Sequence, residues 1–210
     1  MRRQLVVMAR WPVMGRCKRR LAAGIGRRPA ALVQRRLTEH TVASCLSVAA
    51  LGDGRLQPQI LLAADPLGPA AARRWAQQLG VQRGLPQGRG CLGLRMRRQL
   101  ERAWREGSHQ VVLIGSDLPE LEPGDLVEAF LALERSRLVL GPAVDGGYWL
   151  IGLSHRASAP LVSALFSGMP WGSAQVLEQT VAVAHQQGVE PALLMQRRDL
   201  DRSADLRPWR

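Results

Sequence analysis

The sequence is poor in the residues that mark several common classes of protein. Its three cysteines, Cys17, Cys45 and Cys91, are widely spaced and odd in number. They predict neither a disulfide framework nor a zinc cluster, and free thiols favour the reducing cytoplasm. No apolar run approaches the roughly 20 residues of a membrane span. The run at residues 5–9 is too short for a signal-peptide core, so a cytoplasmic protein is expected.

Acidic and aromatic residues are also scarce. The chain carries 17 Asp and Glu against 29 Lys and Arg, a formal net charge of +12, and only 4% of its residues are aromatic. Such a charge suits an acidic partner, which could be nucleic acid, an anionic membrane or a phosphate-rich small molecule. The arginines are scattered and no aromatic residues alternate with them in a basic strip, which disfavours nucleic acid.

What the chain does contain is an alternation of strand and helix patterns. Apolar runs typical of buried strands lie at 5–9, 60–64, 111–114, 138–140, 149–153 and 192–195. Helical patterns lie at 29–51, 70–79, 92–106 and 173–187, the last with Ser173 as N-cap, and a further helix is predicted to begin at Glu122 and Pro123. Residues 10–18 and 85–90 are predicted to form loops. This order predicts α/β architecture, with a mostly parallel sheet covered by helices on both faces. With 210 residues, a single domain is expected.

The most distinctive segment is Leu140–Leu153, where two apolar ends enclose Asp145, Gly146, Gly147 and the only tyrosine, Tyr148. Asp-Gly between apolar runs predicts a β-hairpin. Paired glycines also let backbone N–H groups approach a ligand closely, and a carboxylate beside them can hold a metal or a hydroxyl group. The hairpin and a site at its tip are compatible.

Three further segments carry candidate chemistry near strand ends, where open α/β sheets bind ligands. The loop after the first strand contains Arg10, Gly15, Lys18 and Arg20, a composition that suits phosphates, although a solvated basic loop is an equal alternative. Asp117 follows the third strand and could hold Mg²⁺ or Mn²⁺, or simply cap a helix. Asp199 and Asp201 could return a second metal ligand, or form a charged turn.

Other candidate groups are weaker. None of the four histidines pairs with a cysteine or an acid at ligand spacing, and Ser116 lacks the context of a hydrolase nucleophile. Trp171 could pack in the hydrophobic core or stack against a base or sugar.

Taken together, these segments resemble the bacterial family of nucleotide-diphospho-sugar transferases with the GT-A fold, which is often assigned to arsenosugar biosynthesis. Five motifs match in order: Arg10, Pro12, Gly15, Lys18, Arg20 and Leu21; Gly115–Pro119; Leu140–Tyr148; Leu165, Phe166, Gly168 and Trp171; and Asp199–Leu206. The fold is similar to that of nucleotidylyltransferases such as the molybdenum-cofactor and 2-phospho-lactate guanylyltransferases.

The resemblance implies a role for each segment. Arg10, Gly15, Lys18 and Arg20 would bind the phosphates of the nucleotide, and Asp117 would hold a divalent metal, with Asp199 or Asp201 as the returning ligand. Asp145, as a catalytic group, would lie with Gly146, Gly147, Tyr148 and Trp171 at the sugar or acceptor. The implied reaction is metal-dependent transfer from a nucleotide-diphospho-sugar to a small-molecule acceptor, by a chain that could form a homo-oligomer.

The chain also departs from the family pattern. Arg19 and Arg202 stand where threonine is usual, and Cys91 and Leu94 replace two acids, which makes the site more basic. Two other functions stay open: a nucleotidylyltransferase, which would use a nucleoside triphosphate and release pyrophosphate, and a degenerate protein that only binds a nucleotide or polyanion. The missing glycine-rich opening loop disfavours the first.

Overall fold

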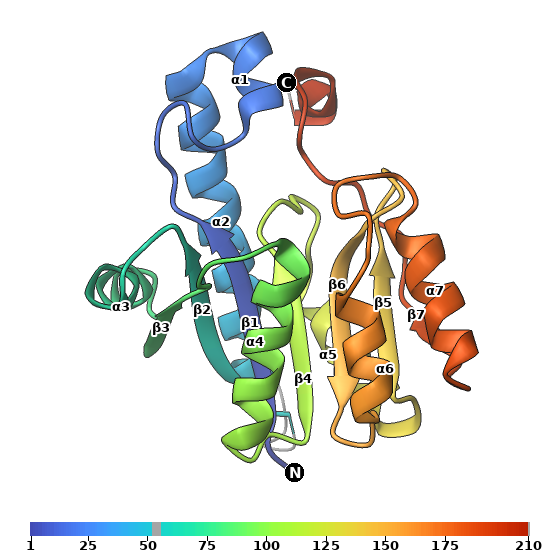
Figure 1. Cartoon of the computed structure of the whole chain (residues 1–210). Coiled ribbons are helices and arrows are strands. Elements are labelled where there is room, and N and C mark those ends of the chain that lie inside the picture. The colour runs from blue at the N-terminus through green and yellow to red at the C-terminus, as the bar shows by residue number, and fades with distance from the viewer. Residues whose placement is uncertain (52–55, 210) are drawn as a thin grey trace.

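The computed structural model describes residues 1–51 and 56–209, and it confirms a mixed α/β architecture (Figure 1). The strands are β1 (Arg3–Arg10), β2 (Gln59–Asp65), β3 (Arg83–Pro86), β4 (Gln110–Gly115), β5 (Leu138–Pro142), β6 (Tyr148–Ser154) and β7 (Ala192–Leu193). The helices are α1 (Arg19–Ile25), α2 (Arg27–Leu51), α3 (Pro69–Gln78), α4 (Leu92–Arg105), α5 (Pro123–Arg135), α6 (Ala159–Phe166) and α7 (Val176–Gln186), with a 3₁₀ helix, η1, at Ser203–Trp209.

The described strands form one sheet in the order β3-β2-β1-β4-β6-β5-β7. Within it, β6 pairs antiparallel with both β4 and β5, whereas the other pairs are parallel. The prediction of a mostly parallel sheet is therefore confirmed. So is the hairpin, because Leu138–Pro142 pairs with Tyr148–Ser154 across the Asp-Gly turn.

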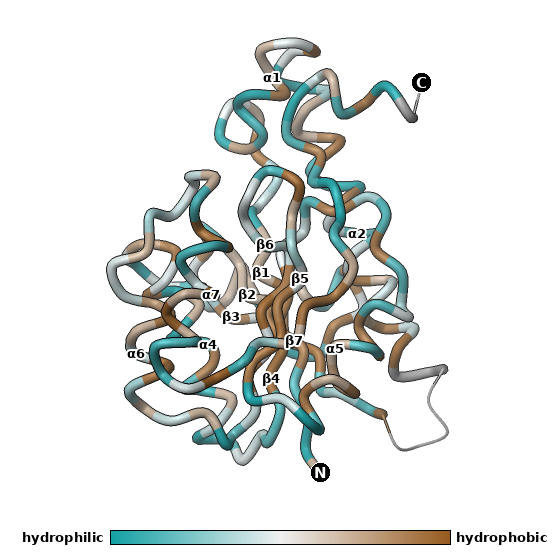
Figure 2. The backbone as a smooth tube through the Cα atoms, turned by 90° about the vertical axis from the view of Figure 1, so that its right-hand side faces the viewer, coloured by the Kyte–Doolittle hydropathy of each residue, from teal (hydrophilic) through white to brown (hydrophobic). Residues whose placement is uncertain are grey.

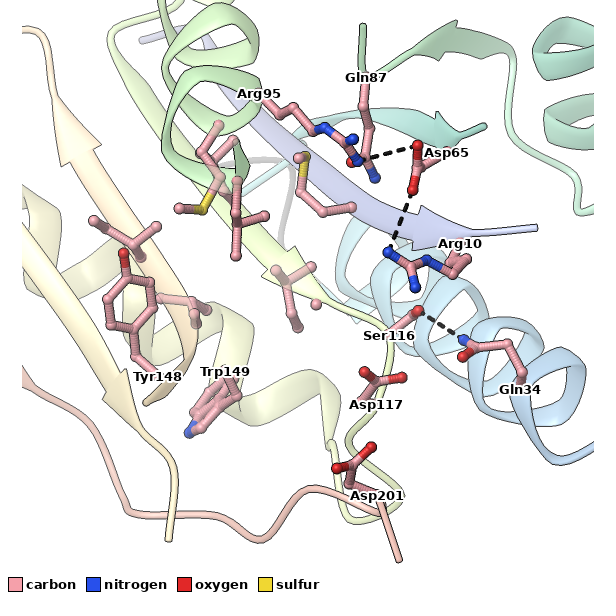
Figure 3. Close-up of a pocket in the computed structure, with 18 of the residues that line it drawn as sticks. Arg10, Gln34, Asp65, Gln87, Arg95, Ser116, Asp117, Tyr148, Trp149 and Asp201 are labelled. Carbon is pink, nitrogen blue, oxygen red and sulfur yellow. Dashed lines mark hydrogen bonds and ion pairs between the residues drawn. The ribbon is translucent and has the colours of Figure 1, made fainter. Parts of the chain in front are cut away.

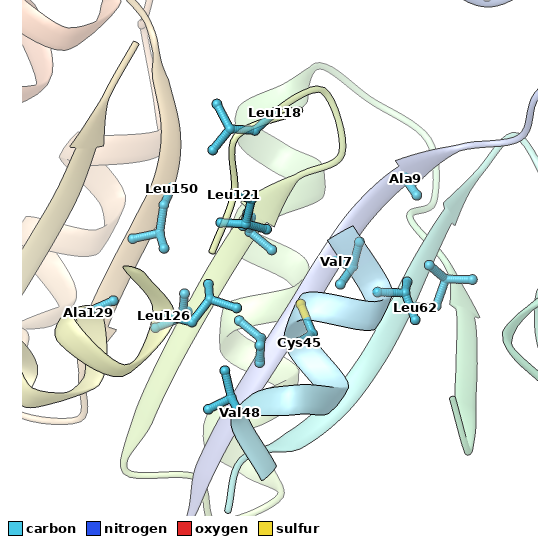
Figure 4. Close-up of a cluster of buried hydrophobic side chains, with 14 of the residues drawn as sticks. Val7, Ala9, Cys45, Val48, Leu62, Leu118, Leu121, Leu126, Ala129 and Leu150 are labelled. Carbon is cyan, nitrogen blue, oxygen red and sulfur yellow. The ribbon is translucent and has the colours of Figure 1, made fainter. Parts of the chain in front are cut away.

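Alternating side chains divide the core between the two faces of the sheet. On β1, Leu5, Val7 and Ala9 face one cluster, which includes side chains of α2, α3 and α5 (Figure 4), and Val6 faces the other, built with α4, α6 and α7. Seen along the sheet, helices flank both sides of the apolar strands (Figure 2). Both faces are buried, which explains why the strands read as continuous apolar runs.

Several local predictions need correction. Residues 83–86, partly placed in a loop, form β3, because they pair with β2 as an edge strand. Helix α7 begins at Val176 rather than after Ser173. Ser173 instead lies in a turn, in which its N–H donates a hydrogen bond to the carbonyl of Pro170. Helices α1 and α6 and the 3₁₀ helix η1 were not predicted, as short helices carry little periodic signal.

Segments from distant parts of the chain gather beyond the carboxyl ends of the central strands. Helix α1 and the C-terminal segment lie together there (Figure 1), packed around Leu21, Ala30, Leu37 and Leu200. This small third cluster brings residues about 180 positions apart to the same end of β1 and β4. None of the helices in the described part of the chain is long and apolar enough to cross a membrane.

The close packing of β3 on α3 generates a stability prediction. A Cβ added at Gly84 would lie 2.1 Å from the carbonyl oxygen of Ala72, which is backbone and cannot move aside. Gly84→Ala should therefore lower the free energy of unfolding by about 1–3 kcal/mol. Gly124→Ala is the control, because its Cβ would meet nothing within 4 Å and alanine favours a helix. Equal melting temperatures for the two variants would contradict this packing.

A second prediction concerns the Arg83–Glu106 pair, which joins β3 to the end of α4 through two contacts of 2.7 and 2.8 Å. The hydrogen bonds from Arg83 lower the pKa of Glu106 from its ordinary value. A lowered folded-state pKa contributes stability above the unfolded pKa and loses it as pH falls through the folded value. The deficit in thermal stability of Glu106→Gln should thus be largest near neutral pH and shrink as the pH falls below the ordinary range of glutamate; a deficit that does not change with pH would refute the pairing.

Candidate functional site

A cleft of about 670 Å³ opens at the carboxyl ends of β1, β2 and β4 (Figure 3). Its floor is apolar and includes Met8, Leu113 and Ile114, and its rim is charged. Of the residues predicted from the sequence, six line it: Arg10, Lys18, Arg20, Asp117, Tyr148 and Asp201. The cleft thus collects side chains from the first loop, the end of β4, the hairpin and the C-terminal segment.

Lys18 occupies the centre of this arrangement. Its side chain is 2% exposed, and its ammonium group lies 2.8 Å from Oδ1 of Asp117 while donating a hydrogen bond to the carbonyl of Leu200. The backbone N–H of Leu200 in turn bonds to the carbonyl of Asp117, at 2.9 Å. Lys18 also has a left-handed backbone conformation, with φ 46°, directly before α1. A non-glycine residue held there costs free energy that the surrounding contacts must offset.

A second ion pair joins the same segments at the surface. Arg20 donates to Asp201 at 2.9 Å, and both side chains are substantially exposed. In the structure, therefore, two cations predicted for phosphate are paired with two carboxylates predicted for metal. Figure 3 shows Asp117 and Asp201 next to each other at the open end of the cleft.

Asp199 adds a third carboxylate to this region. Burial, together with the nearby charges of Asp117 and Asp145, raises the pKa of Asp199 to about 7. A carboxyl group whose pKa is raised by neighbouring carboxylates is a feature of sites that bind cations. The described residues contain no group of three acids, histidines or cysteines already close enough to hold a metal. The acids would suit Mg²⁺, which is usually held by one or two carboxylates together with substrate phosphates.

The hairpin tip lies beside the cleft rather than along its lining. Asp145 is exposed, and its Oδ1 accepts a hydrogen bond from Gly147 N–H at 2.9 Å. Gly146 has φ +87°, and a Cβ there would lie 2.1 Å from the carbonyl oxygen of Ala174, so glycine is required for close packing of the tip. The N–H of Val144 bonds to the carbonyl of Arg197, which places the tip against the segment that leads to Asp199.

Tyr148 and Trp171 lie together. Their ring centroids are 6.3 Å apart in an edge-to-face arrangement, but of the two only Tyr148 lines the cleft. Burial raises the pKa of the Tyr148 phenol. Trp171 packs against the α4, α6 and α7 side of the core. Gly15 lies away from the cleft, in a neighbouring hollow.

The structure adds cleft residues that the sequence reasoning missed. Asp65 is the last residue of β2 and forms ion pairs with Arg10 at 3.5 Å and Arg95 at 3.0 Å (Figure 3). Buried Gln87 donates to the carbonyls of Ala9 and Ala63. Asp65 had a readable signal, since it ends an apolar run just as Asp117 follows one. Gln87 had none.

Two of the residues that differ from the family pattern also line the cleft. Arg19 and Cys91 line it, and Cys91 is exposed directly before α4. Leu94, three residues after Cys91, and Arg202, next to Asp201, are both exposed. The substitutions therefore alter the charge of the cleft itself.

The contact between Lys18 and Asp117 predicts an energetic coupling. In a double-mutant cycle of Lys18→Met and Asp117→Asn, each single variant leaves its partner without an opposite charge. The double variant should recover roughly 0.5–2 kcal/mol of the summed loss in unfolding free energy. Denaturant titration of the four proteins measures this coupling, and additive losses would show that the two groups do not interact.

Comparison with known proteins gives consistent results. The chain aligns with a Desulfovibrio desulfuricans G20 protein that carries the name nucleotide-diphospho-sugar transferase, at 29% identity over 98% of this chain and 85% of that one, with a TM-score of 0.83. A CMP:2-keto-3-deoxy-manno-octonic acid synthetase complexed with CTP is 10% identical, covering 100% and 97% of the two chains, with a TM-score of 0.60.

Glucosyl-3-phosphoglycerate synthase from Mycobacterium tuberculosis, in complex with Mn²⁺, UDP and glucosyl-3-phosphoglycerate, is 15% identical over 97% of this chain and 74% of that one, with a TM-score of 0.53. No curated protein sequence matches the chain. The fold is therefore the GT-A fold shared by nucleotide-sugar transferases and nucleotidyltransferases. Residues 48–173 match DUF2064, described as an uncharacterized protein conserved in bacteria, and the chain belongs to this family.

Proposed function

We propose that this chain is a glycosyltransferase that takes its sugar from a nucleotide-diphospho-sugar bound in the cleft. The observation that carries the proposal is the meeting of Lys18, Arg20, Asp117 and Asp201 at the carboxyl ends of β1 and β4. At the carboxyl ends of neighbouring strands, carboxylates can hold a metal ion and cationic side chains can bind the diphosphate. The similarity in fold to transferases with nucleotide ligands supports the same assignment.

The ion pairs suggest how the site accepts its ligand. Lys18 is paired with Asp117, and Arg20 with Asp201. A divalent cation would stabilise negative charge on the diphosphate leaving group when bound, and Asp117, with Asp199 or Asp201, would hold it. Arg10 and Arg20 are both more than half exposed, and their guanidinium groups can turn toward the phosphates and stabilise the same charge.

The acceptor would approach from the hairpin side. One oxygen of Asp145 is fixed by Gly147 N–H, which leaves the other available to an acceptor hydroxyl. In the transfer, the acceptor oxygen forms a bond to the anomeric carbon while the bond from that carbon to the diphosphate breaks. The hydroxyl proton goes to a base, for which Asp145 is the candidate within this part of the site. An arsenic-bearing acceptor follows only from the family resemblance.

Ligand binding to the folded state tests the donor. A thermal-shift panel of nucleoside diphosphates, triphosphates and nucleotide-sugars, each with and without Mg²⁺ or Mn²⁺, should give a metal-dependent rise with one nucleotide-sugar. At a concentration about 100 times Kd the expected rise is roughly 5–10 °C. Asp117→Asn should abolish the metal-dependent part, whereas Glu128→Gln, an exposed carboxylate on α5 away from the cleft, should keep it.

The products distinguish the alternatives. With the donor identified, release of nucleoside diphosphate in the presence of an acceptor supports the glycosyltransferase. Binding of a triphosphate alone, with release of pyrophosphate, would instead establish a nucleotidylyltransferase on the same fold. No shift with any ligand would point to a degenerate site.

A further inference from the structure

A second hollow adjoins the cleft, on the other side of the first loop. It measures about 790 Å³ and is lined by the loop, by α1 and by the first residue of α2, Arg27. Four of its eight lining residues are arginines: Arg10, Arg16, Arg19 and Arg27. Arg10 and Arg19 also line the cleft, so the two spaces share a wall.

The charges in this hollow are not balanced by acids. Within residues 1–51 and 56–209, no carboxylate lies within ion-pair distance of Arg16, Arg19 or Arg27. Arg10 has one acidic partner, Asp65, at 3.5 Å, and Asp65 is shared with Arg95. Guanidinium groups gathered without acids repel one another. An anion among them would replace this repulsion with charge-assisted hydrogen bonds.

A backbone turn and the side chain of Arg27 shape the hollow. The N–H of Arg16 bonds to the carbonyl of Val13 at 3.0 Å, which closes a turn. The turn continues from Gly15, where φ is +75° and an added Cβ would lie 3.5 Å from Cδ of Arg27. The stem of Arg27 thus lies against the loop, at the start of the 25-residue helix α2. The N-terminus of a helix adds a partial positive charge.

We propose that Arg10, Arg16, Arg19 and Arg27 form a second anion site, which binds a terminal phosphate group. The forked guanidinium matches phosphate oxygens in pairs. A phosphate here would belong to a phosphorylated acceptor that reaches across the cleft from the hairpin side, or be the terminal phosphate of the nucleoside triphosphate that the alternative nucleotidylyltransferase would use. The proposal rests on the proposed function in placing the nucleotide in the cleft. The arginines surround one hollow instead of forming a stripe with aromatic residues, which favours a small ligand over nucleic acid.

The test compares two double variants that lose the same charge. Arg16→Gln/Arg27→Gln changes residues that line the hollow and not the cleft. Arg28→Gln/Arg73→Gln changes two exposed arginines that line neither. Calorimetric titration at 150 mM salt uses glycerol 3-phosphate, and the nucleoside diphosphate and triphosphate with the largest thermal shift.

The first double variant should weaken the affected ligand about tenfold or more, and the control should bind as the wild type does. Loss of glycerol 3-phosphate binding with the diphosphate unchanged supports a phosphorylated second substrate. Selective loss of triphosphate over diphosphate binding supports the nucleotide source. Unchanged binding of all three probes, or equal losses in both double variants, would overturn the site. If no nucleotide binds but glycerol 3-phosphate binding is still lost selectively, the proposed function fails and the anion site stands.

Discussion

The ammonium group of Lys18 holds three distant segments of the chain together at the mouth of the cleft. It lies between the carboxylate of Asp117, at the end of β4, and the carbonyl of Leu200, in the C-terminal segment. The lysine itself belongs to the loop after β1. A buried ammonium is costly without such partners, so the loop, the strand end and the returning segment depend on one another. The left-handed backbone of Lys18 is the strained conformation that this placement requires.

Several acidic and basic side chains of the site are paired with each other. Arg20 pairs with Asp201 and Arg10 with Asp65. The Arg20–Asp201 pair is exposed on both sides, and ion pairs of this kind contribute little to stability, typically about 1 kcal/mol or less. They can therefore exchange partners at small cost when a ligand brings charges of its own. Asp199 differs, because burial among carboxylates keeps its pKa raised to about 7, and it has most to gain from a nearby cation.

Several elements of the fold follow from local pattern. The apolar runs at 5–9, 60–64 and 111–114 became β1, β2 and β4, since strands buried on both faces have few alternatives to a parallel sheet. Asp-Gly at 145–146 marked the hairpin, whose geometry a turn residue decides locally. Strand β3 was not predicted, because Arg83–Pro86 is short and becomes a strand only by pairing with β2. Helix α1 is likewise short and needs the Leu21 and Leu200 cluster to hold it.

By itself the sequence determined the α/β order, the hairpin and the presence of acidic and basic residues at strand ends, because each depends on neighbours a few positions apart. Only the tertiary structure decided which of those residues share a cleft. It brought Arg10 and Arg95 to Asp65, placed Asp145 beside the cleft, and turned Lys18 toward Asp117. It also gathered Arg16, Arg19 and Arg27 around one hollow. Contacts between residues far apart in the chain depend on how strands pair and helices pack, and no local pattern encodes them.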